Sequence, residues 1–285
     1  MKVRRFTTWV LFSCVALWLL AGCKKASTIS AEHAGVHAAL LVSKASADVR
    51  EVRTGLPVGA PLLASIFATG KPPSEDPQGA RRALEKARDK VQELRVAKST
   101  FFAVADATGL VIRNDQEQDQ MAGKYLFEAF PDLKKAIAGQ YLETRGSMPE
   151  AAGVKGRADG QWIAGAPIVK GTDVVGLYVT GWSWAAYAYR LENALNENLR
   201  SQLKEGTKQP LTYVYLLVDH DAFGTPISPE VNAKAIVALG PLSKLPASGQ
   251  ATFELEIDGR EFGLGVARAP ELGKDVAIAV LRSET

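Results

Sequence analysis

The stretch that decides the fold is residues 161–182, which read QWIAGAPIVKGTDVVGLYVTGW. Apolar, β-branched and aromatic residues fill both halves, and the short KGTD segment between them carries a glycine and polar residues. This pattern predicts two strands, 161–168 and 174–182, joined as an antiparallel hairpin. The fold therefore contains an antiparallel sheet.

The segments before and after this hairpin complete a first block. Strand-like residues at 101–106 and 110–113 flank the turn Asp106-Ala-Thr-Gly109. Residues 78–98 place apolar side chains at alternating steps of four and three, which predicts a helix with one apolar face. Such a helix packs on a sheet or on another helix, or forms a short coiled-coil seam. Helical character returns over 183–205.

A second block repeats this order of elements. Residues 211–219 predict a strand and 229–239 a helix that opens with Ser228 and Pro229. Two strands, 253–257 and 261–267, surround an Asp-Gly turn, and a last strand covers 275–281. The two blocks share the order of their elements but little sequence.

Residues 99–182 resemble a Cache domain, the extracytoplasmic relative of PAS domains, and residues 211–282 resemble a second, divergent module. The motifs that carry the first resemblance are Phe102–Asp106, Gly109–Ile112, Gly123–Leu126, Pro131–Gly139, Trp162–Ile168 and Val174–Gly181. The resemblance implies an α+β fold with two PAS-like, Cache-like modules of antiparallel sheets, preceded by long N-terminal helices. It also implies a small-molecule pocket under the last strands of the sheet.

The N-terminus predicts export. Lys2, Arg4 and Arg5 precede an apolar run from Trp9 to Leu20, which is too short for a transmembrane span and typical of a signal peptide. Its ending, Leu20-Ala-Gly-Cys23, resembles a bacterial lipobox, and the resemblance implies that Cys23 is lipidated after removal of residues 1–22. A plain signal peptide or a short buried helix is the alternative.

Cysteine usage agrees with this interpretation. The chain holds two cysteines, Cys14 and Cys23. Processing would leave no free thiol, which excludes a disulfide, a cysteine metal site and a cysteine nucleophile. Acyl chains such as palmitate would hold the protein on a membrane. Lys24 and Lys25 follow Cys23, and resemblance to enterobacterial lipoproteins then favours the periplasmic face of the outer membrane over the inner membrane.

The predicted organisation has four parts. Residues 1–22 are the lipoprotein signal peptide, and residues 23–77 are the lipidated tether with an N-terminal helix over 31–54. Residues 78–205 form the first Cache-like module with its flanking helices, and residues 206–285 form the second. No later segment has the apolar length of a membrane span, and the chain carries no output domain. We therefore expect it to act through a partner, such as a sensor kinase or a transporter.

The candidate ligand-binding residues combine aromatic rings with charges. Alternation along a strand places Tyr178 and Trp182 on one face, while Trp162 lies among small residues on the neighbouring strand. Arginine side chains bind a carboxylate in a bidentate way, and an aspartate pairs with an amine. The candidates are Trp162, Tyr178, Trp182, Arg145, Arg113, Tyr125 and Asp173. The alternative is that the aromatic residues are core and the charged residues are solvated.

Other chemistry finds little support in the sequence. The chain has 34 Lys and Arg against 31 Asp and Glu, and three of the basic residues belong to the signal peptide, so nothing favours nucleic-acid binding. No hydrolase, P-loop or dinucleotide-binding motif is present. His33 and His37 have the spacing of a metal pair on a helix, but a complete ligand set is missing. We predict no enzyme activity, no cofactor and no metal.

Two functions follow as hypotheses. The first is a membrane-anchored extracytoplasmic lipoprotein that binds an amino acid, a carboxylate or an amine and senses through a partner. The second is an envelope docking protein without a ligand, whose helices pair with a second copy or with another protein.

Overall fold

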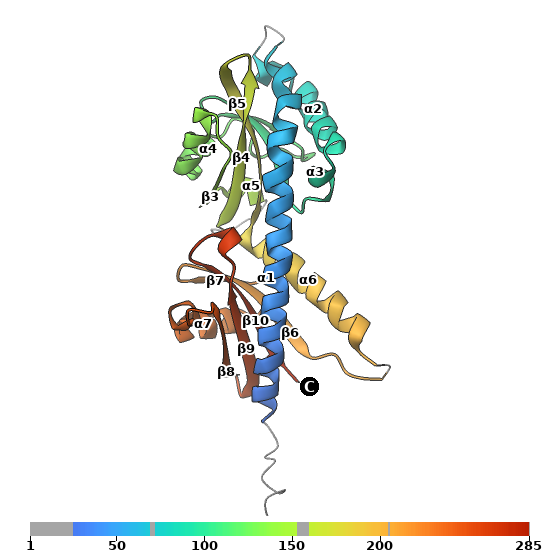
Figure 1. Ribbon diagram of the computed structural model, residues 1–285, viewed down its shortest axis with the longest axis vertical. Helices are drawn as coiled ribbons and strands as arrows, with labels where there is room; N and C mark the ends of the chain where they lie inside the picture. The colour runs from blue at the N-terminus through green and yellow to red at the C-terminus, as the bar shows by residue number, and fades with distance from the viewer. Residues whose placement is uncertain (1–24, 69–71, 153–159, 205, 285) are drawn as a thin grey trace, which may run out of the picture.

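The computed structural model describes residues 25–68, 72–152, 160–204 and 206–284. The predicted signal peptide and Cys23 lie outside them. Two α+β modules are stacked end to end along one long helix (Figure 1). Within the described ranges, no helix is both long and apolar enough to span a membrane.

Helix α1 (Ala26–Gly59) is the axis of the molecule. Its 34 residues span about 50 Å at 1.5 Å per residue. The N-terminal half covers the second sheet and the C-terminal half covers the first (Figure 1). The helix continues past the predicted end at residue 54, because Gly55 is a packing glycine. A methyl group there would lie 2.8 Å from a Leu94 side-chain carbon.

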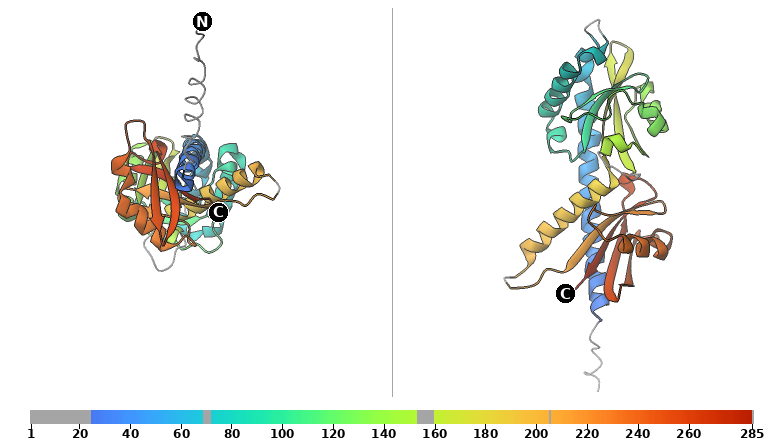
Figure 2. Two further views of the ribbon diagram at one scale, coloured as in Figure 1. Left: turned by 90° about the horizontal axis from the view of Figure 1, so that it is seen from below. Right: turned by 180° about the vertical axis from the view of Figure 1, so that it is seen from behind.

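The first module is built on a five-stranded antiparallel sheet with the strand order β2-β1-β5-β4-β3. Its strands are β1 (Phe101–Asp106), β2 (Val111–Asn114), β3 (Leu142–Gly146), β4 (Gln161–Lys170) and β5 (Asp173–Ser183). One face carries α1, η1 (Ala60–Phe67), η2 (Pro73–Glu75), α2 (Pro77–Lys90) and α3 (Gln92–Val96). The other carries α4 (Leu126–Ala129), η3 (Pro131–Ala138) and α5 (Pro149–Ala152), and Figure 2 shows the sheet between these two layers.

The second module repeats this topology. Its strand order is β7-β6-β10-β9-β8, which is the order of the first sheet shifted by five strands. The strands are β6 (Leu211–Val218), β7 (Asp221–Phe223), β8 (Gln250–Ile257), β9 (Arg260–Arg268) and β10 (Val276–Ser283). Its short helices are α7 (Glu230–Leu239), η4 (Pro241–Lys244) and η5 (Pro270–Leu272), and α6 (Trp184–Gln202) joins the modules. The predicted α+β fold with two modules is confirmed.

One continuous core joins the two modules. It contains buried residues of α1 from Ala34 to Leu56, of the first sheet, of α6, and of β6 and β10. Separate clusters lie under α4 and η3 in the first module and under α7 in the second. Burying one large apolar side chain stabilises a fold by about 1.5–3 kcal/mol. Because α1 buries several such side chains in the shared core, it is the main link between the modules.

Two local predictions are corrected. The helix predicted over 78–98 is broken at Val91, whose extended backbone (φ −106°, ψ 113°) separates α2 from α3. Strand β3 is not among the strands predicted from the sequence. It is a half-exposed edge strand, so its sequence lacks the alternation that reveals a strand with one buried face.

Candidate functional site

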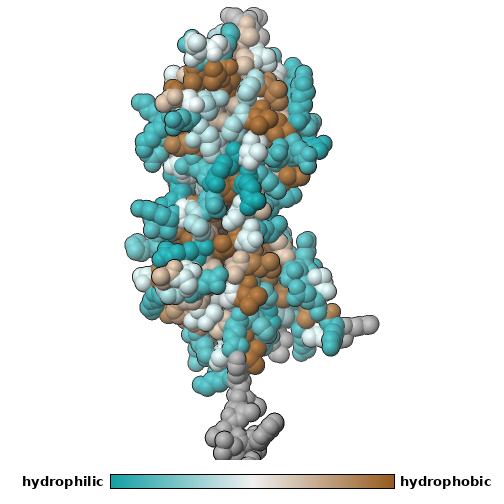
Figure 3. Space-filling model, viewed as in Figure 1, coloured by the Kyte–Doolittle hydropathy of each residue, from teal (hydrophilic) through white to brown (hydrophobic). Residues whose placement is uncertain are grey.

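A cavity of about 300 Å³ lies where the two modules meet. Three elements of the first module and one of the second form its walls. The lining residues are Arg53 of α1, Glu143, Thr144 and Arg145 of β3, Trp162 of β4, and Pro270 to Gly273 around η5. Figure 3 shows hydrophilic residues gathered at the waist between the two lobes, where α1 passes.

Arg53 ties the two modules together across this cavity. Its Nε and Nη2 donate to the two oxygens of Glu143 at 2.8 and 3.0 Å, and its Nη1 donates to Glu271 Oε2 at 2.7 Å. The Tyr141 hydroxyl also donates to Glu143 Oε1 at 2.9 Å. The bond to Glu143 raises the pKa of Arg53, so this side chain stays charged. Arg53 therefore neutralises the two acidic residues of the cavity wall.

Arg145 makes fewer polar contacts than Arg53. Its Nη1 lies 3.5 Å from Asp219 Oδ2, and this atom is buried without a hydrogen-bond partner in the described part of the chain. Gly273 has φ +143°, and a methyl group there would lie 3.7 Å from Arg145 Nε. The guanidinium thus lies against a glycine backbone with hydrogen-bonding capacity unused.

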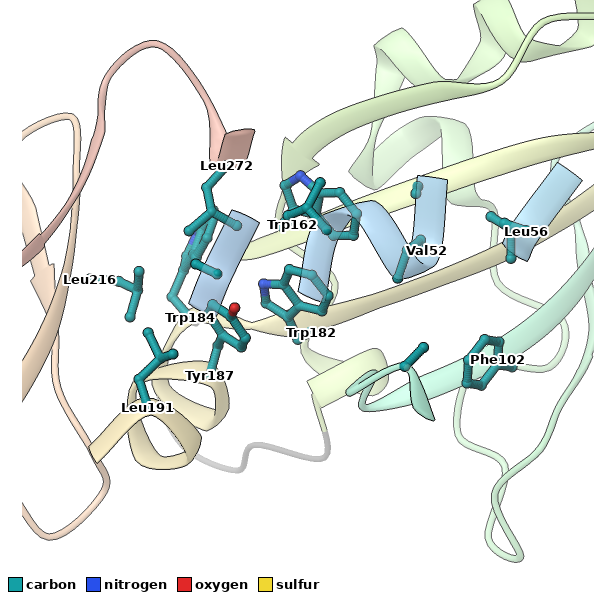
Figure 4. Close-up of a cluster of buried hydrophobic side chains, with 14 of the residues drawn as sticks. Val52, Leu56, Phe102, Trp162, Trp182, Trp184, Tyr187, Leu191, Leu216 and Leu272 are labelled. Carbon is teal, nitrogen blue, oxygen red and sulfur yellow. The ribbon is translucent and has the colours of Figure 1, made fainter. Parts of the chain in front are cut away.

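Trp162 connects this cavity to the core. It lies directly opposite Arg145 in the pairing of β3 with β4. Its ring stacks on Trp182 with centroids 4.3 Å apart, and Trp182 stacks on Tyr187 at 4.6 Å. Figure 4 shows these three rings side by side, with Leu272 of the second module next to Trp162. The Tyr187 hydroxyl donates to the buried Asp48 of α1 at 2.9 Å.

The structure brings together two of the predicted ligand-binding residues, Arg145 and Trp162. Tyr178 and Trp182 lie in the core beneath α1 and are not among the lining residues of this cavity. Tyr178 fits against Gly59 of α1. Both faces of β5 are buried, so the alternation of its residues could not show which face α1 packs against.

The other three candidates lie elsewhere. Arg113 is a buried residue of β2 whose Nη1 pairs with Asp119 at 3.2 Å and whose Nη2 donates to the Gln116 carbonyl at 2.7 Å. Tyr125 is half exposed and forms an isolated bridge with Leu110. Asp173 is exposed at the start of β5. None of the three lines the cavity between the modules.

The histidines are dispersed. His33 pairs with Glu284 at 3.2 Å, while His37 is buried and its Nδ1 has no hydrogen-bond partner in the described residues. His220 lines a second cavity of about 280 Å³ between β6 and α7, next to Asp219. Across the described ranges, no three His, Cys, Asp or Glu side chains gather as a metal-ligand set.

Sequence reasoning missed Arg53, Glu143 and Glu271. Glu143 and Arg145 alternate along β3 and so share a face, which would have signalled a charged surface had the strand been recognised. Arg53 and Glu271 are separated by 218 residues, and no local pattern connects them.

No family model matches this chain, and neither does any curated protein. Solved structures do match. The extracellular domain of vpHK1S-Z8, described as a histidine kinase, has a TM-score of 0.55 at 9% identity, covering 90% of this chain and 92% of that one. A domain from Vibrio parahaemolyticus, described as belonging to the sensory box/GGDEF family, has a TM-score of 0.54 at 9% identity, covering 92% and 98%.

A third similar structure is the ligand-binding domain of the Pseudomonas aeruginosa PAO1 amino acid chemoreceptor PctC, in complex with GABA. Its TM-score is 0.49 at 16% identity, over 89% of this chain and 99% of that one. The structural neighbours are Cache/PAS-like sensor domains of histidine kinases and chemoreceptors. At these identities the similarity shows the fold.

Proposed function

We propose that this protein is an extracytoplasmic sensor that binds a small molecule in the cavity between its modules and reports binding to a partner protein. The observation that carries the proposal is Arg145, a half-buried side chain beside Trp162 in a cavity of about 300 Å³, whose Nη1 has no hydrogen-bond partner in the described residues. Ligand sites combine apolar and aromatic walls with a few converging polar groups, and this volume fits one small metabolite.

Each wall of the cavity has a distinct role in this proposal. Arg145 offers donors to a carboxylate, and Trp162, which is 1% exposed, closes the apolar floor of the cavity. Glu271 uses one oxygen for Arg53 and is partly exposed, so it can receive an amine. An amino acid, a carboxylate or an amine fits this set of groups.

The anchor in the proposal is a lipid on Cys23. Helix α1 begins at Ala26, three residues after that cysteine, so the second module would lie next to the membrane. Arg53 lies 27 residues along α1, which places the cavity about 40 Å further out. Labelling of cells with a palmitate analogue tests the anchor. We expect label and membrane association in the wild type and their loss in Cys23→Ser, and fractionation assigns the protein to the outer or the inner membrane.

A thermal-shift screen of the chain from Ala26 onward tests ligand binding. Amino acids, carboxylates and amines form the panel, because a ligand at a hundredfold excess over its dissociation constant stabilises the folded state by about 2.7 kcal/mol. We expect one class to raise the Tm, and Arg145→Gln or Trp162→Phe to abolish the shift. Arg82→Gln, an exposed change on α2, is the control. A ligand whose shift survives both cavity variants would contradict this site.

The exposed face of α1 favours docking as a second candidate function. Val36 and Leu40 are 68% and 45% exposed, and the exposed residues continue at Ser43, Ala47, Arg50 and Thr54 in steps of three and four. Val36 and Leu40 are the large apolar side chains of this strip, and the occupant we propose is a second copy of this chain that packs its own Val36 and Leu40 against them. We expect Leu40→Glu to convert a dimer to a monomer in sedimentation, with Val169→Glu as the exposed control. A monomeric wild type would reject this candidate.

A further inference from the structure

We infer that Asp219 of the second module is an internal competitor for Arg145, so that ligand binding and the Arg145–Asp219 ion pair exclude each other. The inference rests on the proposed function of the cavity. It narrows the ligand class to carboxylates and identifies how the second module senses that the cavity is filled.

The position of Asp219 makes it suitable for exchange. It follows β6 directly and has a left-handed backbone (φ 54°), while its N–H donates to the Asp275 carbonyl at 3.1 Å. The backbone is thus fixed, and the side chain alone reaches across the module boundary to Arg145. That side chain is 58% exposed, so water competes for its oxygens.

The Arg145–Asp219 contact is weak by the standards of arginine. A guanidinium and a carboxylate in their best geometry form two parallel hydrogen bonds of about 2.7–2.9 Å. The Arg145–Asp219 pair has instead one N···O separation of 3.5 Å, and Nη1 donates no hydrogen bond within the described residues. The Arg145 side chain is 29% exposed and lines the cavity, so a ligand carboxylate can form two such bonds with the guanidinium and draw it away from Asp219.

The neighbouring acidic residues cannot take the role of Asp219. Both oxygens of Glu143 and one oxygen of Glu271 already accept hydrogen bonds from Arg53. These bonds keep the modules joined while Asp219 is released. Displacement is therefore confined to the turn between β6 and β7.

Release of Asp219 changes the second module locally. Asp219 also lines the second cavity, with His220 of the same turn, Leu217 of β6, Asp221 of β7 and residues of α7 and η4. Carboxylate binding at Arg145 would thus add an unpaired negative charge to the rim of that second cavity. The state of one cavity is passed to the other through a single ion pair.

The test measures affinity in wild type, Asp219→Asn and Asp221→Asn. The probes are acetate, succinate, L-glutamate and the other straight-chain mono- and dicarboxylates of two to six carbons, with the corresponding alkylamines for comparison. Asparagine tolerates the left-handed backbone as aspartate does, so the turn is preserved. Asp221 is the matched control, because it lies two residues further on, at the start of β7, and no ion pair joins it to Arg145 among the described residues.

We expect Asp219→Asn to tighten carboxylate binding three- to tenfold, Asp221→Asn to leave it unchanged, and Arg145→Gln to abolish it. In the wild type, a bound carboxylate should also speed amide hydrogen exchange at residues 219–223, and in Asp219→Asn the exchange should be fast without ligand.

Three results would overturn the inference. Carboxylates that bind wild type and Asp219→Asn equally leave the proposed function intact but remove the competitor. If amines bind and no carboxylate does, the proposed function also remains intact, but the inference fails because the ligand is not a carboxylate. If no probe binds any of the folded variants, the cavity is not the site, and the inference fails together with the proposed function.

Discussion

Buried polar side chains on α1 are the residue-scale features with the largest energetic consequence. Asp48 is 4% exposed, and the Tyr187 hydroxyl of α6 donates to it at 2.9 Å. Burial raises the pKa of the Tyr187 hydroxyl, and the negative charge of Asp48 raises it further. The hydroxyl therefore keeps its proton and remains a hydrogen-bond donor. Loss of a hydrogen bond to a buried carboxylate lowers the free energy of unfolding more than the same loss at an exposed carboxylate.

Tyr187→Phe should therefore lower the free energy of unfolding by about 1–3 kcal/mol, since Asp48 stays buried without this donor. Urea denaturation measures the loss. Tyr189→Phe is the matched control, because Tyr189 lies on the same helix and is 49% exposed. Equal stabilities of the two variants would show that the hydrogen bond contributes nothing.

His37 should make folding sensitive to acid. Burial, and then the charge of Arg282, lower the pKa of His37 from 6.5 to about 4. Between these values the unfolded chain binds a proton at this residue and the folded chain does not. Its contribution to stability is complete above pH 6.5 and is lost as the pH falls toward 4, by about 2–3 kcal/mol at pH 4.5.

The measurement is the free energy of unfolding at pH 7.5 and at pH 4.5. His37→Gln should lose less stability on acidification than the wild type, by the same 2–3 kcal/mol, because glutamine binds no proton. His220→Gln serves as the exposed control, and its pH dependence should follow the wild type. An identical pH dependence in all three proteins would contradict the prediction.

At the scale of elements, the contact between α1 and β9 depends on glycines in the strand. A methyl group at Gly263 would overlap the backbone of Ala31, and one at Gly265 would overlap that of Ala34. The helix can lie this close to the sheet only because these two positions lack a side chain.

Gly265→Ala should push α1 away from β9 and destabilise the protein by about 1–3 kcal/mol. Gly35→Ala, on the facing turn of α1, is the control. The added methyl meets the methyl of Thr252 at 2.8 Å instead of backbone, and alanine favours the helix by about 1 kcal/mol. Chemical denaturation compares the two, and a larger loss in Gly35→Ala would refute this account of the packing.

At the scale of the whole molecule, the shared helix and continuous core make the two modules one folding unit. The core residues of α1 run from Ala34 under the second sheet to Leu56 under the first. Loss of α1 would expose apolar surface of both sheets.

We expect a single unfolding transition for the chain from Ala26 onward. Far-UV circular dichroism follows both modules, while fluorescence follows Trp162, Trp182 and Trp184 near their junction. The two signals should change at the same urea concentration. Val280→Ala, in the core of the second sheet, should shift both signals equally. Separate midpoints would show that the modules unfold independently.

The sequence by itself determined the order of elements and the two-module α+β fold. Alternation in 161–182 and the Asp-Gly turn at 258–259 predicted hairpins that the structure contains. Such patterns are local, because the side chains of one strand or helix report which of its own faces is buried. Strand alternation selected Trp162 as a candidate ligand residue, and the family resemblance with the carboxylate-binding chemistry of arginine selected Arg145.

Only the tertiary structure decided where the cavity lies. Strand β5 is buried on both faces, so its alternation could not reveal that α1 covers Tyr178 and Trp182. Arg53, Arg145 and Asp219 belong to segments far apart in the chain, and no periodicity records that they meet. A cavity between two modules is set by how those modules pack on a shared helix, which is a long-range property that a local pattern does not encode.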